Sequence, residues 1–318
     1  MKRLFVALCC TLTSFFAAAQ DYPTRPIRLV IGFPPGGSND VVARIIGPKM
    51  AEILGQPVVI ENRPGANATV GTDFVAKSAP DGYTITLGSL SPLVISLATY
   101  PKISYDTARD FAPINTVALT PEIIAVHPSV PAKTLADLVA LSKTKQMSLS
   151  SSGNGGLPHL AIELLKNVSG GNFLHVPYKG AAPAVTDAVG GHVQGVIMDL
   201  PALASQVKDG KLRALAVTNR QRTTVLPDVP TSGEQGLAGV QAVNWFAMMA
   251  PRGTPAPIVA KINDALMKTL AQPAIKEHFA NIGVEVFTHA SPEAFRTFLV
   301  EEIALWGKIA RDAGAKAD

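Results

Sequence analysis

Two glycine-rich turns carry the residues best suited to hold a ligand, and the first lies near the start of the chain. It separates a strand-like stretch from a helix-like one and consists of Phe33, Pro34, Pro35, Gly36, Gly37 and Ser38. Glycine lets a ligand approach the backbone closely, and the free N–H groups at a helix N-terminus favour an anion. We expect Ser38 to cap a helix that begins at Asn39. A plain strand-to-helix connection with no ligand is the alternative.

Gly32 and Gly37 also have the spacing of a nucleotide phosphate-binding loop. Ser38 stands where that motif requires lysine, and no later acidic strand end suits magnesium. Nucleotide hydrolysis is therefore disfavoured, and the first turn is interpreted as a site for a small anion.

The second turn repeats this arrangement in the middle of the chain. A helix is predicted to begin near Leu157, after a turn formed by Ser151, Ser152, Gly153, Asn154, Gly155 and Gly156. Two such turns facing each other would clamp one carboxylate. Each charge-assisted hydrogen bond contributes roughly 1.5–3 kcal/mol, and micromolar binding needs about 8 kcal/mol. A few backbone amides therefore suffice without a buried lysine or arginine.

Two further polar residues end predicted strands. Asp199 closes the stretch VQGVIMD, where it either accepts a hydrogen bond from a ligand ammonium group or caps the next helix. Tyr178 follows the strand in FLHVPYKG, where a ligand contact and a solvated loop are both open interpretations.

Enzymatic chemistry finds little support in the residue pattern. No Gly-x-Ser-x-Gly turn occurs, and the 6 histidines lack metal-ligand spacing. His159 and His175 are interpreted as structural side chains. We therefore expect no catalytic residue, no metal and no cofactor. A secreted hydrolase or isomerase that uses Ser151 or Asp199 is the alternative.

The stretches around these turns alternate between strand and helix patterns, which predicts two α/β units with parallel sheets. In the first unit, strands are expected at 27–32, 57–61 and 83–88 and helices at 39–54 and 69–78, with Gly55 as the stop of the first helix. In the second, strands are expected at 123–126, 148–151, 173–176, 193–198 and 213–217, and helices at 135–143, 157–168, 183–189 and 201–208. Helices at 257–270 and 292–311 follow.

Short connections near 117–122 and 243–250 indicate that the chain crosses twice between two lobes. We expect one lobe over residues 20–119 plus 246–318 and the other over residues 120–245. A double crossing lets the lobes close around a cleft, which is the usual place for a small ligand.

The composition favours an exported protein that binds a small molecule. Of the 318 residues, 47% are hydrophobic and 16% are charged, and the formal net charge is +4. These values give no electrostatic signature for nucleic acid or a membrane surface.

The first residues predict a secretory signal peptide over residues 1–19. Lys2 and Arg3 precede an apolar run that is too short to span a membrane, and cleavage is expected near Ala19. Both cysteines of the chain lie in this segment. The mature protein is therefore expected to be periplasmic and free of disulfides.

Several phrases in consistent order resemble one family. They are YPTRPIRLVIGFPPGG, VVIENRPGA, AKSAPDGYT, YDTARDFAPI, HVPYKGAAPAVTD, GKLRALAVT, LPDVPT and APRGTP. The sequence is similar to the Bug-type extracytoplasmic solute receptors, the binding-protein component of tripartite tricarboxylate transporters. This resemblance implies a two-lobed α/β fold of the type II periplasmic binding protein class, with a cleft between the domains. It also implies that the cleft closes on a small carboxylate and presents it to membrane transporter subunits.

Carried onto this chain, the resemblance places ligand-binding loops at Phe33–Ser38 and Ser151–Gly156, with Ser89, Tyr178 and Asp199 as further cleft residues. A monomer is expected, and a ligand-sensing subunit of a membrane signalling protein is a further alternative. The sequence departs from the family pattern at 67–69, where Asn-Ala-Thr replaces a usual glycine pair, and at Gly156, where serine or threonine is frequent. The first departure is expected to stiffen its loop, and the second removes a hydroxyl from the second turn.

Overall fold

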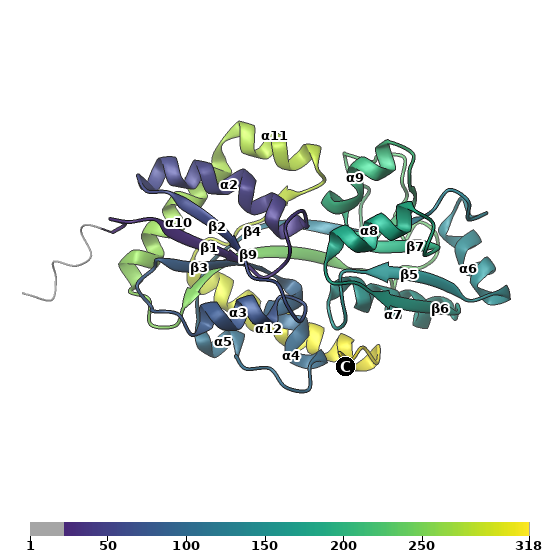
Figure 1. The fold of residues 1–318 in the computed structure, drawn as a ribbon, viewed down its shortest axis with the longest axis horizontal. Helices are drawn as coiled ribbons and strands as arrows, with labels where there is room; N and C mark the ends of the chain where they lie inside the picture. Colours follow the sequence, from purple (N-terminus) through teal and green to yellow (C-terminus); the bar gives the residue numbers. More distant parts are fainter. Residues whose placement is uncertain (1–21, 318) are drawn as a thin grey trace, which may run out of the picture.

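The computed structural model describes residues 22–317, which form two α/β halves lying side by side (Figure 1). The predicted signal peptide lies outside these residues. Within the described part of the chain, no helix has both the length and the apolar character that crossing a membrane requires.

The first half is built on three parallel strands whose order is β2-β1-β3, namely β1 (Ile27–Ile31), β2 (Val58–Asn62) and β3 (Thr84–Ser89). Two helices make the crossovers, α2 (Ser38–Leu54) and α3 (Thr69–Ala76). α2 ends where Gly55 adopts a left-handed conformation with a φ of 71°, the helix stop expected from the sequence. The predicted strand–helix alternation of this half is confirmed, and each element lies within two residues of its expected bounds.

The second half repeats the arrangement around β5, which pairs in parallel with two neighbours. Its strands are β5 (Met147–Ser151), β6 (Phe173–Pro177), β7 (Gly195–Asp199) and β8 (Arg213–Val217). Its helices are α6 (Leu135–Thr144), α7 (Leu157–Ser169), α8 (Ala181–Val189) and α9 (Leu200–Lys208). Because the carboxyl ends of parallel strands lie at one edge of a sheet, the loops after β5, β6 and β7 gather near the other half.

Two long strands join the halves, β4 (Phe111–Val126) and β9 (Val243–Pro251). β4 pairs with β9 from Phe111 to Pro121 and then with β7 and β8 from Glu122 to Val126, so one strand belongs to both sheets. The sequence predicted short connections here. The crossings are instead made by the antiparallel strands β4 and β9. The side chains of both strands are buried along almost their whole length, which favours regular strands over loops.

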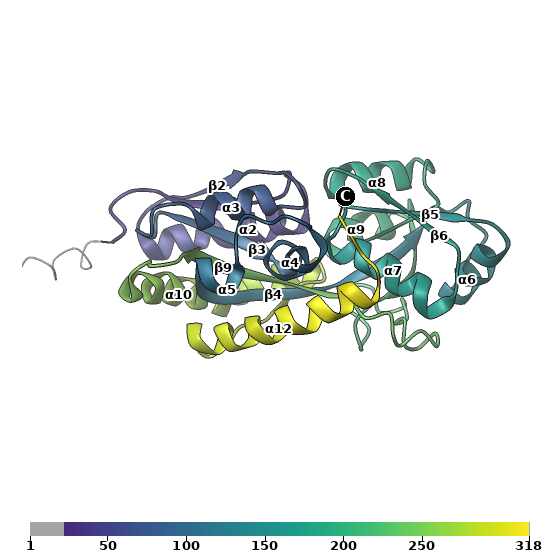
Figure 2. The same cartoon turned by 90° about the horizontal axis from the view of Figure 1, so that it is seen from below.

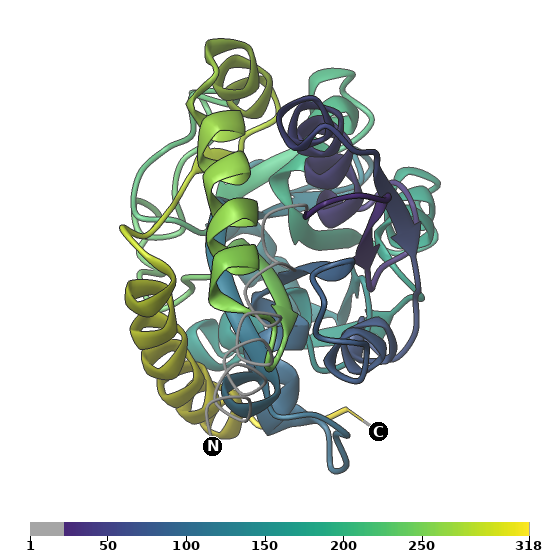
Figure 3. The same ribbon diagram turned by 90° about the vertical axis from the view of Figure 1, so that its left-hand side faces the viewer.

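The remaining elements complete the first half and cover its sheet. α10 (Ala256–Ala271) packs on α2, and α12 (Pro292–Asp312) runs along β4 toward the second half (Figures 2 and 3). Four short elements and one helix were not expected: η2 (Ser91–Ile95, a π-helical turn), α4 (Ser96–Thr99), α5 (Thr107–Asp110), β10 (Glu285–Val286) and α11 (Pro273–Asn281). Three of them, η2, α4 and α5, fill the stretch between β3 and β4.

The largest hydrophobic core crosses from one half to the other. It contains Leu90 and Val94 from the first half, Leu149 and Leu160 from the second, and Trp245 from β9. Each half also has a smaller core on the opposite face of its sheet. The shared core holds the edges of the two sheets against each other and so fixes how their loops meet.

Candidate ligand-binding site

Two adjoining cavities lie between the halves and share Phe33, Pro34 and Ser152 in their walls. The deep cavity has a volume of about 30 Å³, enough to hold at least one water molecule. The outer cavity has a volume of about 590 Å³. The deep cavity is lined about equally by polar and apolar groups of both halves and of β9. The polar residues are Ser38, Asn39, Ser89, Ser91, Ser152, Asp199 and Asn244.

The N-terminus of α2 faces the deep cavity through Gly37, Ser38 and Asn39. The first N–H groups of a helix have no partner inside the helix, so they are available to a ligand. We expected Ser38 to be the helix cap, and this is wrong: Gly37 occupies the N-cap position in an extended conformation, and Ser38 is the first helical residue. The Ser38 side chain is 5% exposed, and its hydroxyl has no hydrogen-bond partner among the described residues.

Asp40 fixes the shape of this first turn from behind. Its carboxylate accepts hydrogen bonds from the backbone N–H of Gly36 at 3.0 Å, from Asn62 at 3.0 Å and from the Arg44 guanidinium at 2.8 and 2.9 Å. Burial acts to raise the Asp40 pKa, but these hydrogen bonds outweigh it and lower the pKa. The amide of Gly36 is thus already engaged, whereas Gly37, Ser38 and Asn39 line the cavity.

The second turn uses much of its backbone inside the protein. The N–H groups of Gly153, Gly155 and Leu157 donate to the Ser151 hydroxyl at 3.2 Å, to His159 Nδ1 at 3.0 Å and to the Ser91 hydroxyl at 2.9 Å. The N-terminus of α7 therefore docks on the first half. These three amides bind groups of the protein and therefore cannot form the second side of the expected clamp.

The N-terminus of α8 lies against the first turn, where a Cβ atom at Gly37 would be 3.9 Å from Ala181 Cβ, and the N-terminus of α9 lines the same cavity through Asp199. Ala181, the first residue of α8, lines the deep cavity, and Gly180 before it has a φ of 110°. A Cβ atom at Gly180 would lie 2.9 Å from Pro34 Cγ. Glycine is required here both for the backbone conformation and for the contact between halves.

Ser151 lies beneath the second turn, fully buried and outside the walls of both cavities. Its hydroxyl is 2.6 Å from His175 Nε2, and the His175 ring stacks on His159 at 3.9 Å between centroids. Burial, aided by His159, lowers the His175 pKa to about 3, so the ring is neutral at physiological pH. The serine–histidine contact thus supports the turn from inside and has no access to a solute.

The sequence left two roles open for Asp199, a contact with the ligand and a cap on the next helix, and the structure shows features of both. It occupies the N-cap position of α9, but its side chain makes no capping bond and instead lines the deep cavity. Both carboxylate oxygens accept from Asn244 Nδ2, at 3.0 and 3.1 Å. Glu122 of β4 stands opposite Asp199 in strand register. An acidic residue inside the apolar stretch PEIIAV was the sequence signal for this neighbour.

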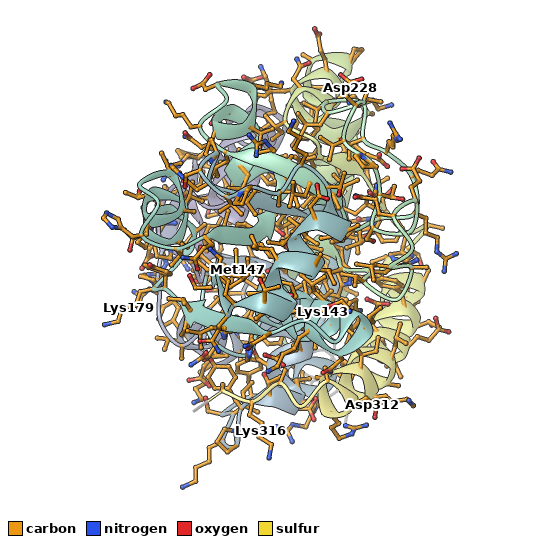
Figure 4. The ribbon with its side chains drawn as sticks, turned by 90° about the vertical axis from the view of Figure 1, so that its right-hand side faces the viewer. Lys143, Met147, Lys179, Asp228, Asp312 and Lys316 are labelled. Atoms are coloured by element: carbon orange, nitrogen blue, oxygen red, sulfur yellow. The ribbon has the colours of Figure 1, made fainter. Side chains whose placement is uncertain are left out.

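The outer cavity has backbone-rich walls from both halves. Tyr178 lines it, and its hydroxyl donates to Asp187 at 2.6 Å, which raises the Tyr178 pKa to about 12. Lys179 also contributes to its wall, and Figure 4 shows this side chain reaching outward at the margin of the second half.

The two departures from the family pattern meet beside this wall, to which Asn67 contributes and Gly156 does not. Ala66, Asn67 and Ala68 all have positive φ, at 43°, 51° and 70°, a conformation that is strained for residues with a side chain. The Asn67 side chain lies against Gly156, where a Cβ atom would be 2.7 Å from Asn67 Nδ2. Asparagine in one half thus occupies the space that glycine leaves in the other.

The structure brings most of the predicted site residues into the two walls. Seven line the deep cavity: Phe33, Pro34, Gly37, Ser38, Ser89, Ser152 and Asp199. Gly153, Asn154 and Tyr178 line the outer one. Pro35, Gly36, Ser151 and Gly155 line neither. Sequence reasoning missed these deep-cavity residues: Asn39, Ser91, Pro158, Ala181, Met198 and Asn244. Across residues 22–317, no three histidine, cysteine or acidic side chains gather as metal ligands would.

Residues 42–315 of this sequence match the model of the protein family described as "Tripartite tricarboxylate transporter family receptor". The chain belongs to this family. Protein BugT of Bordetella pertussis is 39% identical over 302 residues, covering 94% of this chain and 92% of BugT. Family membership confirms the expected receptor class and separates the chain from enzymes.

Solved structures of receptors agree with the observed fold. Rpa4515 of R. palustris with adipate superposes with a TM-score of 0.90 at 35% identity, covering 94% of this chain and all (100%) of that one. MatC from Rhodopseudomonas palustris with bound malate gives 0.86 at 32% identity, with coverages of 91% and 99%. The periplasmic binding protein BugD gives 0.89 at 35% identity, with coverages of 93% and 100%. The predicted two-lobed α/β fold of the periplasmic binding protein class is confirmed. The family match and the periplasmic relatives imply a periplasmic location.

Proposed function

We propose that this receptor captures a small organic carboxylate between its halves and delivers it to the membrane subunits of a tripartite tricarboxylate-type transporter. The observation that carries the proposal is the first turn of α2, whose N-terminal end and buried Ser38 hydroxyl both line one cavity. An anion at that helix end would gain hydrogen bonds and a favourable helix dipole. The adipate and malate found in two structural relatives support this class of solute.

The proposed carboxylate site has two sides. The first turn of α2 supplies amides and the Ser38 hydroxyl, and the N-terminus of α8 closes the site from the second half. The outer cavity, which has about 590 Å³, then takes the rest of the solute. A cavity of this size is typical of small-molecule sites.

The whole-protein assignments complete the proposal. Residues 1–19 are a signal peptide cleaved near Ala19, and the mature receptor acts as a monomer in the periplasm. The lobes comprise residues 20–119 with 246–318 and residues 120–245. The sharing of β4 between both sheets and its departure from β9 at Glu122 support a boundary near residue 120.

Calorimetric titration with mono-, di- and tricarboxylates tests the site through Ser38→Ala. We expect a fall in affinity of about ten-fold or more, since a hydrogen bond to a charged group contributes roughly 1.5–3 kcal/mol. Ser104→Ala, an exposed serine away from the cavities, is the matched control. If no acid in the panel binds the wild-type protein, the proposed function is wrong. If one binds and Ser38→Ala changes nothing, the carboxylate lies elsewhere.

A further inference from the structure

The deep cavity adjoins a pair of carboxyl groups that the proposed carboxylate site does not use. Glu122 and Asp199 are register partners on β4 and β7. Glu122 is fully buried, and neither of its carboxyl oxygens receives a hydrogen bond from a donor in the described chain. Residues directly opposite each other on antiparallel strands have Cβ atoms about 4.5–5.5 Å apart on the same face, so the Asp199 carboxyl lies beside that of Glu122. Two bare carboxylates in contact inside a protein are strongly disfavoured, so the pair holds a proton.

The hydrogen-bond donors around the pair favour the proton on Glu122 and the negative charge on Asp199. Asp199 accepts from Asn244 Nδ2 with both oxygens, and the Asn244 amide is oriented by the N–H of Leu90, which donates to its Oδ1 at 3.3 Å. The nearby Ser38 hydroxyl also lowers the Asp199 pKa, although burial raises it overall. Burial and then the Asp199 charge raise the Glu122 pKa well above its usual range. All the fixed donors therefore surround one member of the pair.

No cation in the described chain balances this charge. The pair is enclosed by β4, β7, β9 and the first turns of α2 and α9, and the groups acting on either carboxyl are the other carboxyl, Asn244 and Ser38. Asp40, the neighbouring acid on α2, is bound to Arg44 and Asn62 instead. An anionic solute in the deep cavity would therefore face the bare side of Asp199, where repulsion is weakly screened.

We propose that Asp199 selects solutes that carry a hydrogen-bond donor close to their carboxylate, namely hydroxy acids or amino acids, and that Glu122 positions Asp199 as the acceptor by keeping the proton. The inference rests on the proposed function, because it concerns the group next to the bound carboxylate. A hydroxyl or ammonium group on the solute would satisfy the remaining acceptor capacity of Asp199. A solute without such a donor binds only when another proton enters the site.

Matched acids that differ by one substituent test the selection. The wild-type protein is titrated calorimetrically with succinate, malate and aspartate, and with the corresponding five- and six-carbon acids so that chain length is not limiting. We expect a donor-bearing member to bind about ten-fold or more tightly than the unsubstituted acid of its length. Asp199→Asn should remove this preference. Glu285→Gln, an exposed acid on β10, is the matched control and should keep it.

Two measurements test the proton itself. Titrations of the wild-type protein in buffers of different ionisation enthalpy count protons, and we expect uptake with the unsubstituted acid and none with the donor-bearing one. Because this experiment needs no variant, it decides the question even if Asp199→Asn fails to fold. Glu122→Met removes the donor to Asp199 and should weaken the preference, while Glu122→Gln, which keeps a donor, should restore it relative to Glu122→Met.

The outcomes separate the two proposals. If acids bind but the members of each series bind equally, or if all bind with the same proton uptake, the role of Asp199 is overturned and carboxylate capture stands. If Asp199→Asn still prefers the donor-bearing acids, a different group accepts the hydrogen bond from the solute and the inference is wrong. If no acid binds at all, carboxylate capture fails and this inference fails with it.

Discussion

The carboxyl group of Glu122 is a buried acid on a strand whose other side chains are almost all apolar, and this has a consequence for stability. Burial and then the charge of Asp199 raise the Glu122 pKa in the folded protein. The folded state therefore binds this proton more tightly than the unfolded chain does. Its contribution to stability is complete below the ordinary glutamate pKa and is lost as pH rises toward the raised folded value.

Glu122→Gln should remove that dependence. We expect the free energy of unfolding of the variant, relative to that of the wild type, to increase as pH rises. The increase is about 1.4 kcal/mol per pH unit between the unfolded and folded pKa values of Glu122. Thermal unfolding followed by circular dichroism at a series of pH values measures the difference. The stability of Glu285→Gln should depend on pH in the same way as that of the wild type. A constant offset between Glu122→Gln and the wild type would show that Glu122 titrates normally.

At the scale of residues, sequence reasoning located the cavity better than it assigned roles. Ser38 was correctly placed beside the turn, but its hydroxyl faces the cavity because Gly37 takes the cap. Asn244 and Asn39 were missed because an isolated asparagine carries no spacing signal. Their function depends on β9 and α2 being brought together by the sheet order, which only the tertiary structure specifies.

At the scale of elements, Gly180 before α8 allows the close contact between the two halves. Gly180→Ala would add a Cβ atom 2.9 Å from Pro34 Cγ and would strain a backbone with a φ of 110°. We expect a loss of stability of roughly 1–3 kcal/mol and weaker solute binding, because Pro34 is pushed away from the second half.

Gly210→Ala is the control for this prediction, since Gly210 has a φ of 70° but no atom near the added Cβ. It should lose stability through strain while keeping its affinity. Thermal unfolding and calorimetric titration of both variants separate the two effects. Equal affinities in the two variants would show that the Pro34 contact does not govern binding.

The regular elements were predictable because their periodicity is local. The alternation from β1 to β3 and from β5 to β8 follows from apolar patterning and glycine stops, and the structure matches it closely. The same local patterns did not predict which helix of the second half faces the N-terminus of α2. α7 has the more glycine-rich approach, yet its N-terminus docks on Ser91, and α8 faces α2 instead. That choice depends on contacts between segments far apart in the sequence.

At the scale of the whole molecule, a few polar contacts join the two halves beside the shared core. Leu157 N–H donates to Ser91 at 2.9 Å, and the Thr99 hydroxyl donates to the carbonyl of Gly155 at 2.9 Å. Within the first half, the chain after α12 is held beside this contact by a backbone bond from Ala317 to Thr99 at 3.0 Å. The bonds from Leu157 and Thr99 join the two halves in this structure.

Ser91→Ala should therefore shift the balance toward a more open form. Leu157 N–H would lose its partner in a buried site, at a cost of about 1–3 kcal/mol. We expect a several-fold to hundred-fold loss of solute affinity and a larger radius of gyration in small-angle scattering without solute. Ser104→Ala should change neither quantity. Unchanged scattering together with unchanged affinity in Ser91→Ala would contradict a closing role for this contact.

The passage of β4 and β9 between the halves also determines how the receptor can move. Flexible loops would let the halves swivel freely, whereas β4 pairs with β9 up to Pro121 and then continues without a break as a strand of the second half. Any separation of the halves must therefore bend this continuous strand at the point where its partners change. A bend at one strand position gives a hinge with a defined axis, about which the two walls of the cavities move apart.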